Sequence, residues 1–163
     1  MIRKVEIERF SAKSSKPFEA VVSAFKAAIG RLDLVEFAKI SKSTSDLADL
    51  ETFIGRSLGS TGLMLFMELD HGAVLRKETG LNKPRMVRLV MGNPLIMKEM
   101  AKHVPDAGSY APVTVLIDER DDGVHLSYDK MVSFLAPYGS AEANTVARDL
   151  DAKVENLIRA SAA

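Results

Sequence analysis

The chain of 163 residues contains no cysteine. Disulfide bonds, thiolate nucleophiles and metal centres held by cysteine are therefore excluded. The formal net charge is zero, because 22 lysines and arginines balance 22 aspartates and glutamates. Non-specific binding to nucleic acid or to an anionic membrane usually requires a broad positive field. We therefore expect neither nucleic acid nor a membrane among the partners of this protein.

Long hydrophobic runs are missing too. No segment approaches the roughly 18 apolar residues of a membrane span, and residues 1–6 lack the apolar core of a signal peptide. The simplest interpretation is a cytoplasmic protein. The motifs of serine hydrolases, kinases and dinucleotide-binding proteins are absent, and Gly59-Ser60-Thr61-Gly62 lacks the lysine and the spacing of a phosphate loop. No motif identifies a cofactor.

Hydrophobic residues make up 47% of the chain, which is enough for the core of one domain spanning residues 1–163. The clearest local pattern is a strand over residues 85–91 that leads directly into a helix over residues 94–100. Gly92 is expected to form the turn and Asn93 to cap the helix. Pro94 suits the first helical position, where its missing N–H costs nothing.

The first half of the chain combines further strands and helices. A strand is expected at residues 2–10, a helix at 18–29, and two short helices at 34–40 and 47–58, with Ser45 capping the second. The nearly continuous hydrophobic run at 63–69 is typical of a strand that is central in its sheet. One or two helical turns should follow at 73–79.

In the second half, the turn Asp121-Asp122-Gly123 joins strands at 113–117 and 124–128 into a hairpin. Residues 104–112 are expected to form a loop, and Ser140 to cap a C-terminal helix within residues 140–163. This mixture predicts an α+β fold: a two-layer sandwich with helices packed against a mixed sheet of about five strands.

Four features together resemble the domain-of-unknown-function 302 family. They are the apolar strand ending at Asp70, the entry Gly92-Asn93-Pro94 into a helix, Pro112 before an apolar strand, and the Asp122-Gly123 hairpin. The similarity covers residues 63–130 well and residues 2–30 more loosely. Residues 31–61 are extra helical material relative to the short members, and Gly92 stands where many relatives have cysteine.

The resemblance implies a compact α/β domain that pairs as a homodimer. It implies no activity, because none is firmly assigned to the family. The departure at Gly92 removes any thiol chemistry that might be carried over from relatives.

Polar residues follow two of the expected strands, Asp70-His71 after one and Asn93-Pro94 after the other. If these strands were parallel neighbours, the two corners would meet at one edge of the sheet, where α/β folds bind ligands. The amides that open the helix after Asn93 would favour an anion there. The alternative is structural, with Asp70 and Asn93 each capping the helix that follows it.

Other side chains complete the candidate ligand-binding set. Arg85 is a possible anion clamp, although it and Arg88 should point to different faces of the strand. Tyr110 is a possible pocket residue, and His103 is included as a polar group near the end of its helix. The candidate ligand-binding residues are thus Asp70, His71, Arg85, Asn93, Pro94, His103 and Tyr110.

The three histidines do not indicate a metal site. None has the i, i+4 spacing of a helical metal pair, so a site would need long-range assembly from Asp70, His71, His103 and Asp106.

Three functions remain open at this level. The first is a small homodimeric module that binds a small molecule in an apolar pocket. The second is an enzyme in which His71 acts as general base beside Asp70. The third is a dimer whose only role is interaction.

Overall fold

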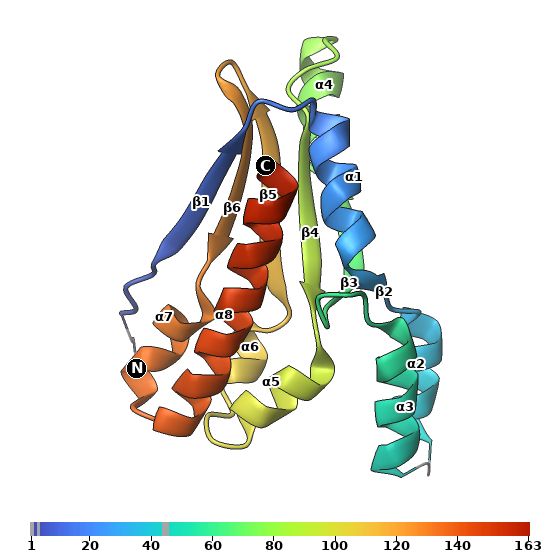
Figure 1. Cartoon of the computed structure of the whole chain (residues 1–163), viewed down its shortest axis with the longest axis vertical. Coiled ribbons are helices and arrows are strands. Elements are labelled where there is room, and N and C mark those ends of the chain that lie inside the picture. Colours follow the sequence, from blue (N-terminus) through green and yellow to red (C-terminus); the bar gives the residue numbers. More distant parts are fainter. Residues whose placement is uncertain (1, 3, 44–45) are drawn as a thin grey trace.

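The protein is built on one six-stranded sheet, seen in a computed structural model that describes every residue except 1, 3, 44 and 45 (Figure 1). In chain order the elements are β1 (Arg9–Ser14), α1 (Phe18–Ala28), β2 (Gly30–Arg31), α2 (Leu34–Lys42), α3 (Leu47–Ser57), β3 (Met64–Asp70), α4 (Gly72–Thr79), β4 (Met86–Gly92), α5 (Pro94–Ala101), α6 (Ala107–Tyr110), β5 (Val113–Arg120), β6 (Gly123–Asp129), α7 (Met131–Leu135), a 3-10 turn (Ala136–Tyr138) and α8 (Ala141–Ala162).

The strand order is β1-β6-β5-β4-β3-β2. Every neighbouring pair is antiparallel except β2 and β3, which are parallel, so the sheet is mixed. The predicted α+β class is therefore confirmed. The sheet has six strands where the sequence indicated about five, because β2 is only two residues long and leaves no periodic pattern.

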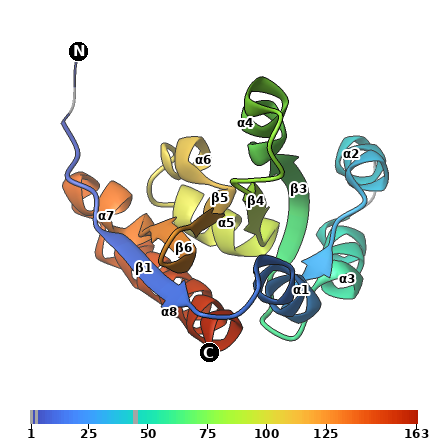
Figure 2. The same cartoon turned by 90° about the horizontal axis from the view of Figure 1, so that it is seen from above.

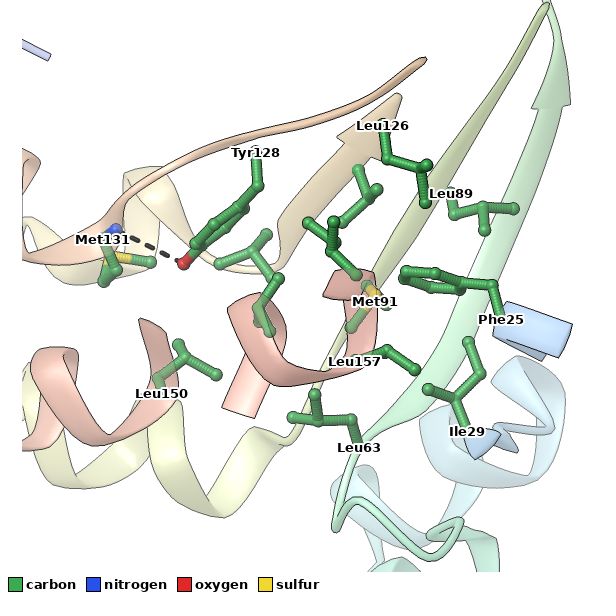
Figure 3. Packing of buried hydrophobic residues seen from close by; sticks show 14 of the residues in the cluster. Phe25, Ile29, Leu63, Leu89, Met91, Leu126, Tyr128, Met131, Leu150 and Leu157 are labelled. Carbon is green, nitrogen blue, oxygen red and sulfur yellow. Dashed lines mark hydrogen bonds between the residues drawn. The ribbon is translucent and has the colours of Figure 1, made fainter. Parts of the chain in front are cut away.

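Helices α1 and α8 lie together on one face of the sheet (Figure 2). The strands turn alternate residues towards them, and in β4 these are the buried Val87, Leu89 and Met91. Phe25 of α1 and Leu157 of α8 meet this layer in the main core, as Figure 3 shows. We call the opposite face, which carries Met86, Arg88 and Val90 of β4, the outer face.

A second, smaller core lies beneath the α2–α3 hairpin. Its buried members are Leu32, Ile54 and Met64. Helix α2 has an apolar side but no buried residue, so only partly buried side chains such as Phe37 hold it in place. Asp33 begins this helix by accepting hydrogen bonds from the amides of residues 35 and 36, both at 2.9 Å.

A buried carboxylate ties α8 to the chain that leaves the sheet. Asp151 of α8 is 3% exposed and accepts hydrogen bonds from the Tyr128 hydroxyl at 2.6 Å and from the amides of Met131 and Val132 at 2.7 and 3.0 Å. It thereby caps α7 from a different helix. Burial raises the pKa of Asp151, and burial together with this carboxylate raises the pKa of Tyr128.

Local signals located most elements correctly. Asn93 caps α5 with Pro94 following it, Gly123 has φ 136° after the two-residue hairpin turn, and Ser140 caps α8. Gly80 ends α4 in the left-handed conformation that glycine adopts readily.

Three sequence expectations were wrong. The first strand is Arg9–Ser14 and not residues 2–10, since it pairs with β6 over that range only. Strand β3 is not central: it lies next to the two-residue edge strand, and its second half is largely exposed. The expected loop at 104–112 contains α6. The expected cap Ser45 lies outside the described residues, and Asp46 caps α3.

Candidate functional site

The two predicted corners of the site do not meet. Strands β3 and β4 are neighbours but antiparallel, with Asp70 opposite Val87 and Met64 opposite Gly92. Asp70 and Asn93 therefore lie at opposite ends of the strand pair, as the positions of α4 and α5 in Figure 1 show. The predicted site at a shared edge is thus wrong, because it assumed parallel strands.

The Asp70 corner is a helix start held by an ion pair. Asp70 accepts a hydrogen bond from the Ala73 amide at 2.9 Å and pairs with Arg76 at 2.7 Å. The Arg76 guanidinium, as the main cause, lowers the pKa of Asp70. His71 is the N-cap residue just before α4 but makes no capping side-chain bond, and no hydrogen bond joins it to a carboxylate in the described part of the chain. The structural alternative describes Asp70 correctly.

The Asn93 corner is different, because a cavity lies beside it. The Asn93 side chain accepts from the Leu95 amide at 2.9 Å and donates to the Gly62 carbonyl at 3.1 Å, which fixes the turn between β4 and α5. The cavity has a volume of about 370 Å³. Its walls come from β3, β4, α2, α5, α8 and the segment before β5, and its lining residues are Leu32, Leu34, Phe37, Phe66, Met67, Val90, Gly92, Asn93, Pro94, Met97, Met100, Ala111, Pro112, Val113 and Leu150.

The cavity is apolar throughout its described lining. None of those lining residues is charged, and the one polar side chain, Asn93, already uses its oxygen and its nitrogen in the turn. Pro94 and Pro112 add rings without a backbone donor. A charged group inside this space would lose its hydration without gaining a side-chain partner.

A β-bulge shapes the cavity wall. The pairing of β3 with β4 shifts between Leu65 and Met67, so Phe66 is an additional residue on β3. Phe66 and Met67 consequently both line the cavity, although adjacent strand residues normally point to opposite faces.

Gly92 of β4 leaves space in the cavity opposite Phe66. A Cβ built on Gly92 would lie 3.5 Å from the Phe66 ring and 4.0 Å from Pro112, which are ordinary contacts. Glycine at this position therefore keeps the cavity open without being required by the backbone.

Three more of the predicted site residues lie away from the cavity. Arg85 holds Glu119 with two hydrogen bonds of 2.9 and 3.0 Å, contacts Glu19 at 3.3 Å and lies over the Phe18 ring. The guanidinium is the main cause that lowers the pKa of Glu119 to about 2. Tyr110 shares a hydrogen bond of 2.9 Å with Tyr138, and His103 is exposed after α5.

Asp70 and Arg85 do come together in a separate hollow of about 330 Å³ beside α1. Each is already neutralised, by Arg76 and by Glu119 respectively. The long-range metal set fails for the reason that separates the corners. Asp70 and His71 lie where β3 leads into α4 at one end of the sheet, whereas His103 and Asp106 lie between α5 and α6 at the other (Figure 1). Within the described residues, no group of three or more histidines and carboxylates is placed to hold a metal ion.

Sequence reasoning found Asn93 and Pro94 but missed most of the cavity. The sequence predicts Phe66 and Met67 to lie in a central strand and Leu34 and Phe37 in a short helix, and it does not indicate that these four residues line one cavity. The one sequence signal was the apolar side of residues 34–42, and the structure leaves that side without a buried residue.

Comparison with known proteins agrees with this architecture. The sequence profile described as "Domain of unknown function DUF302" matches residues 40–161. The chain belongs to the DUF302 family. This match extends beyond residues 63–130 to include α3 and nearly all of α8. A search of curated proteins finds no significant match.

One solved DUF302 protein has the same fold. It is the crystal structure of an uncharacterized conserved DUF302 protein from Bacillus stearothermophilus, with a TM-score of 0.64 and 12% sequence identity. The alignment covers 94% of this chain and 97% of that one. At this level of identity, the similarity establishes the fold alone. None of the helices in the described part of this DUF302 chain is both long and apolar enough to cross a membrane.

Proposed function

We propose that this DUF302 protein is a small-molecule-binding module whose ligand occupies the apolar cavity beside Asn93 and Pro94. The observation that supports this most directly is the cavity itself. Its volume of about 370 Å³ falls within the range of roughly 300–1,000 Å³ that is usual for ligand pockets.

The lining defines what the ligand must be like. Because the described walls are aliphatic, aromatic and methionine side chains, the buried part of the ligand is uncharged and apolar. Met67 and Met97 contribute flexible thioethers that adapt to different shapes. Leu34 and Met67 are 45% and 47% exposed, so the cavity opens to solvent between α2 and β3.

The enzyme alternative has less support. It required His71 as a general base beside an acid, whereas Asp70 is occupied by Arg76 and by the start of α4. The homodimer and the cytoplasmic location stay predictions from the sequence. Sedimentation equilibrium of the purified chain tests the first, and fractionation of the source cells tests the second.

The binding proposal is tested with the uncharged probes decan-1-ol and 1-naphthol. A probe at one hundred times its Kd should stabilise the protein by about 2.7 kcal/mol and raise Tm by roughly 5–11 °C. The variant Gly92→Leu extends a side chain into the cavity and should abolish this rise. Its matched control is Gly55→Leu on exposed α3, where a Cβ has open space and the rise should persist.

Nuclear magnetic resonance shows whether the probe occupies the right place. The amides of Val90 and Gly92 should shift on titration, because both residues line the cavity. Stabilisation that survives in Gly92→Leu would place the probe elsewhere and contradict the proposal.

A further inference from the structure

Strand β4 connects the cavity to a charged residue on the same face. Arg88, Val90 and Gly92 occupy every second position of the strand, and the pairing of β4 with β5 is regular from Met86 to Met91. They therefore point to the same outer face, at steps of about 7 Å. Val90 and Gly92 line the cavity, so Arg88 is the next outward side chain along the strand.

Arg88 borders a second, polar hollow on the outer face. This hollow has a volume of about 350 Å³, and its polar lining residues are Arg9, His71, Arg88, Thr114, Ser127 and Asp129. It adjoins the cavity on two strands, because Arg88 is two positions from Val90 on β4, and Thr114 of β5 is the direct cross-strand partner of Val90. The apolar and polar spaces are consecutive parts of one surface.

The charges in the polar hollow do not cancel. Arg9 and Asp129 satisfy each other through two hydrogen bonds of 2.6 and 2.9 Å. Arg88 has no carboxylate within 4.0 Å anywhere in the described chain, and its side chain is hydrogen-bonded to the Thr114 hydroxyl at 3.4 Å. The residues that pair with Arg88 on the two adjacent strands are Leu69 of β3 and Leu116 of β5, and neither is charged.

We propose that the ligand is an amphipathic anion, with an apolar chain in the cavity and a carboxylate or phosphate group bound by Arg88 and Thr114. This inference rests on the proposed function, since it assigns the class of molecule that fills the same cavity. A guanidinium presents two parallel donors to such an oxyanion, and the Thr114 hydroxyl adds a third. Neither hollow alone selects this class: the cavity lacks charge, and the polar hollow lacks a place for an alkyl chain.

Two probes that differ only in the head group test the proposal. Decanoate and decan-1-ol are titrated into the purified full chain, and the amide shifts of Val90 and Gly92 give each Kd. We expect decanoate to bind at least about tenfold more tightly, as hydrogen bonds to a charged group imply. In Arg88→Met the two Kd values should become similar while that of decan-1-ol is unchanged, and Arg88→Lys should keep part of the preference.

The control variant is Arg148→Met. Arg148 is an exposed arginine on α8 that also bonds to a threonine hydroxyl, that of Thr145 at 3.3 Å, but it lines neither the cavity nor the polar hollow. This variant should keep the full preference for decanoate. Co-sedimentation with phosphatidylglycerol vesicles distinguishes two sources of the bound anion, a lipid head group and a free amphipathic anion. If the anion is a lipid head group, the protein should bind the vesicles and Arg88→Met should abolish that binding; if it is a free anion, the protein should not bind them.

The outcomes separate the two proposals. Equal Kd values for decanoate and decan-1-ol in the unmodified protein, or a preference that persists in Arg88→Met, would overturn the role of Arg88 and leave the apolar cavity as a binding site. If neither probe shifts the cavity amides, then both proposals are wrong.

Discussion

Replacing Gly92 by alanine should stabilise the protein, which is unusual for a substitution at a buried position. Gly92 has an extended conformation in β4, so alanine requires no change of backbone. Its methyl group would lie 3.5 Å from the Phe66 ring and 4.0 Å from Pro112. The added carbon therefore fills empty space and displaces no neighbour.

The magnitude follows from two contributions. Removing a glycine restricts the unfolded chain and contributes about 0.4–1 kcal/mol when the native conformation suits alanine. Burying one additional methyl group contributes about 0.8 kcal/mol. We therefore expect the free energy of unfolding to rise by about 1–2 kcal/mol, which corresponds to roughly 2–8 °C in Tm for a domain of this length.

Urea denaturation of the purified variant, supported by calorimetry, measures this change. The contrasting variant is Gly30→Ala, where a Cβ would lie 1.8 Å from the Ser57 carbonyl oxygen. That overlap should cost at least about 3 kcal/mol. A destabilised Gly92→Ala protein would refute the reasoning, because it would mean that the space beside Phe66 is not open in solution.

Three further substitutions test other parts of the structure. Asp151→Asn should lower the free energy of unfolding by about 3 kcal/mol in urea denaturation, because the asparagine amide cannot accept all the hydrogen bonds that the buried carboxylate accepts. An unchanged midpoint would contradict the capping role of Asp151. Asp70→Ala should cost about 1 kcal/mol as a lost helix cap and leave the Kd of decan-1-ol unchanged, whereas weakened binding would restore the Asp70 corner as a site. The pKa of Glu119 is lowered to about 2, so its pairing with Arg85 stabilises the fold above pH 4.5 and is lost as the pH falls through 2. Glu119→Gln should therefore flatten the acid side of the stability curve between those values, and an unaltered curve would argue against the pair.

Much of the fold could be predicted because its signals are local. The entry Gly92-Asn93-Pro94, the hairpin at Gly123 and the cap at Ser140 each depend on residues within one turn of the chain. Such positions have the same preferences in any fold.

The site could be predicted only in part, because it depends on long-range geometry. Hydrophobic patterning indicated both strands that lead to Asp70 and Asn93, but their relative direction is not encoded in either pattern. Antiparallel pairing separated the two corners. The bulge at Phe66 could not be predicted either, because in a continuous hydrophobic run the sequence does not indicate which residues share a face.

Helix α2 supplies one wall of the cavity through Leu34 and Phe37 but buries no residue of its own. If the cavity binds a ligand as proposed, exchanges at these two positions would alter which molecule is accepted while the main core and the sheet keep their packing. On the proposed function, a wall that adds nothing to the main core would allow the preferred ligand to change within a family whose members keep one fold at low sequence identity.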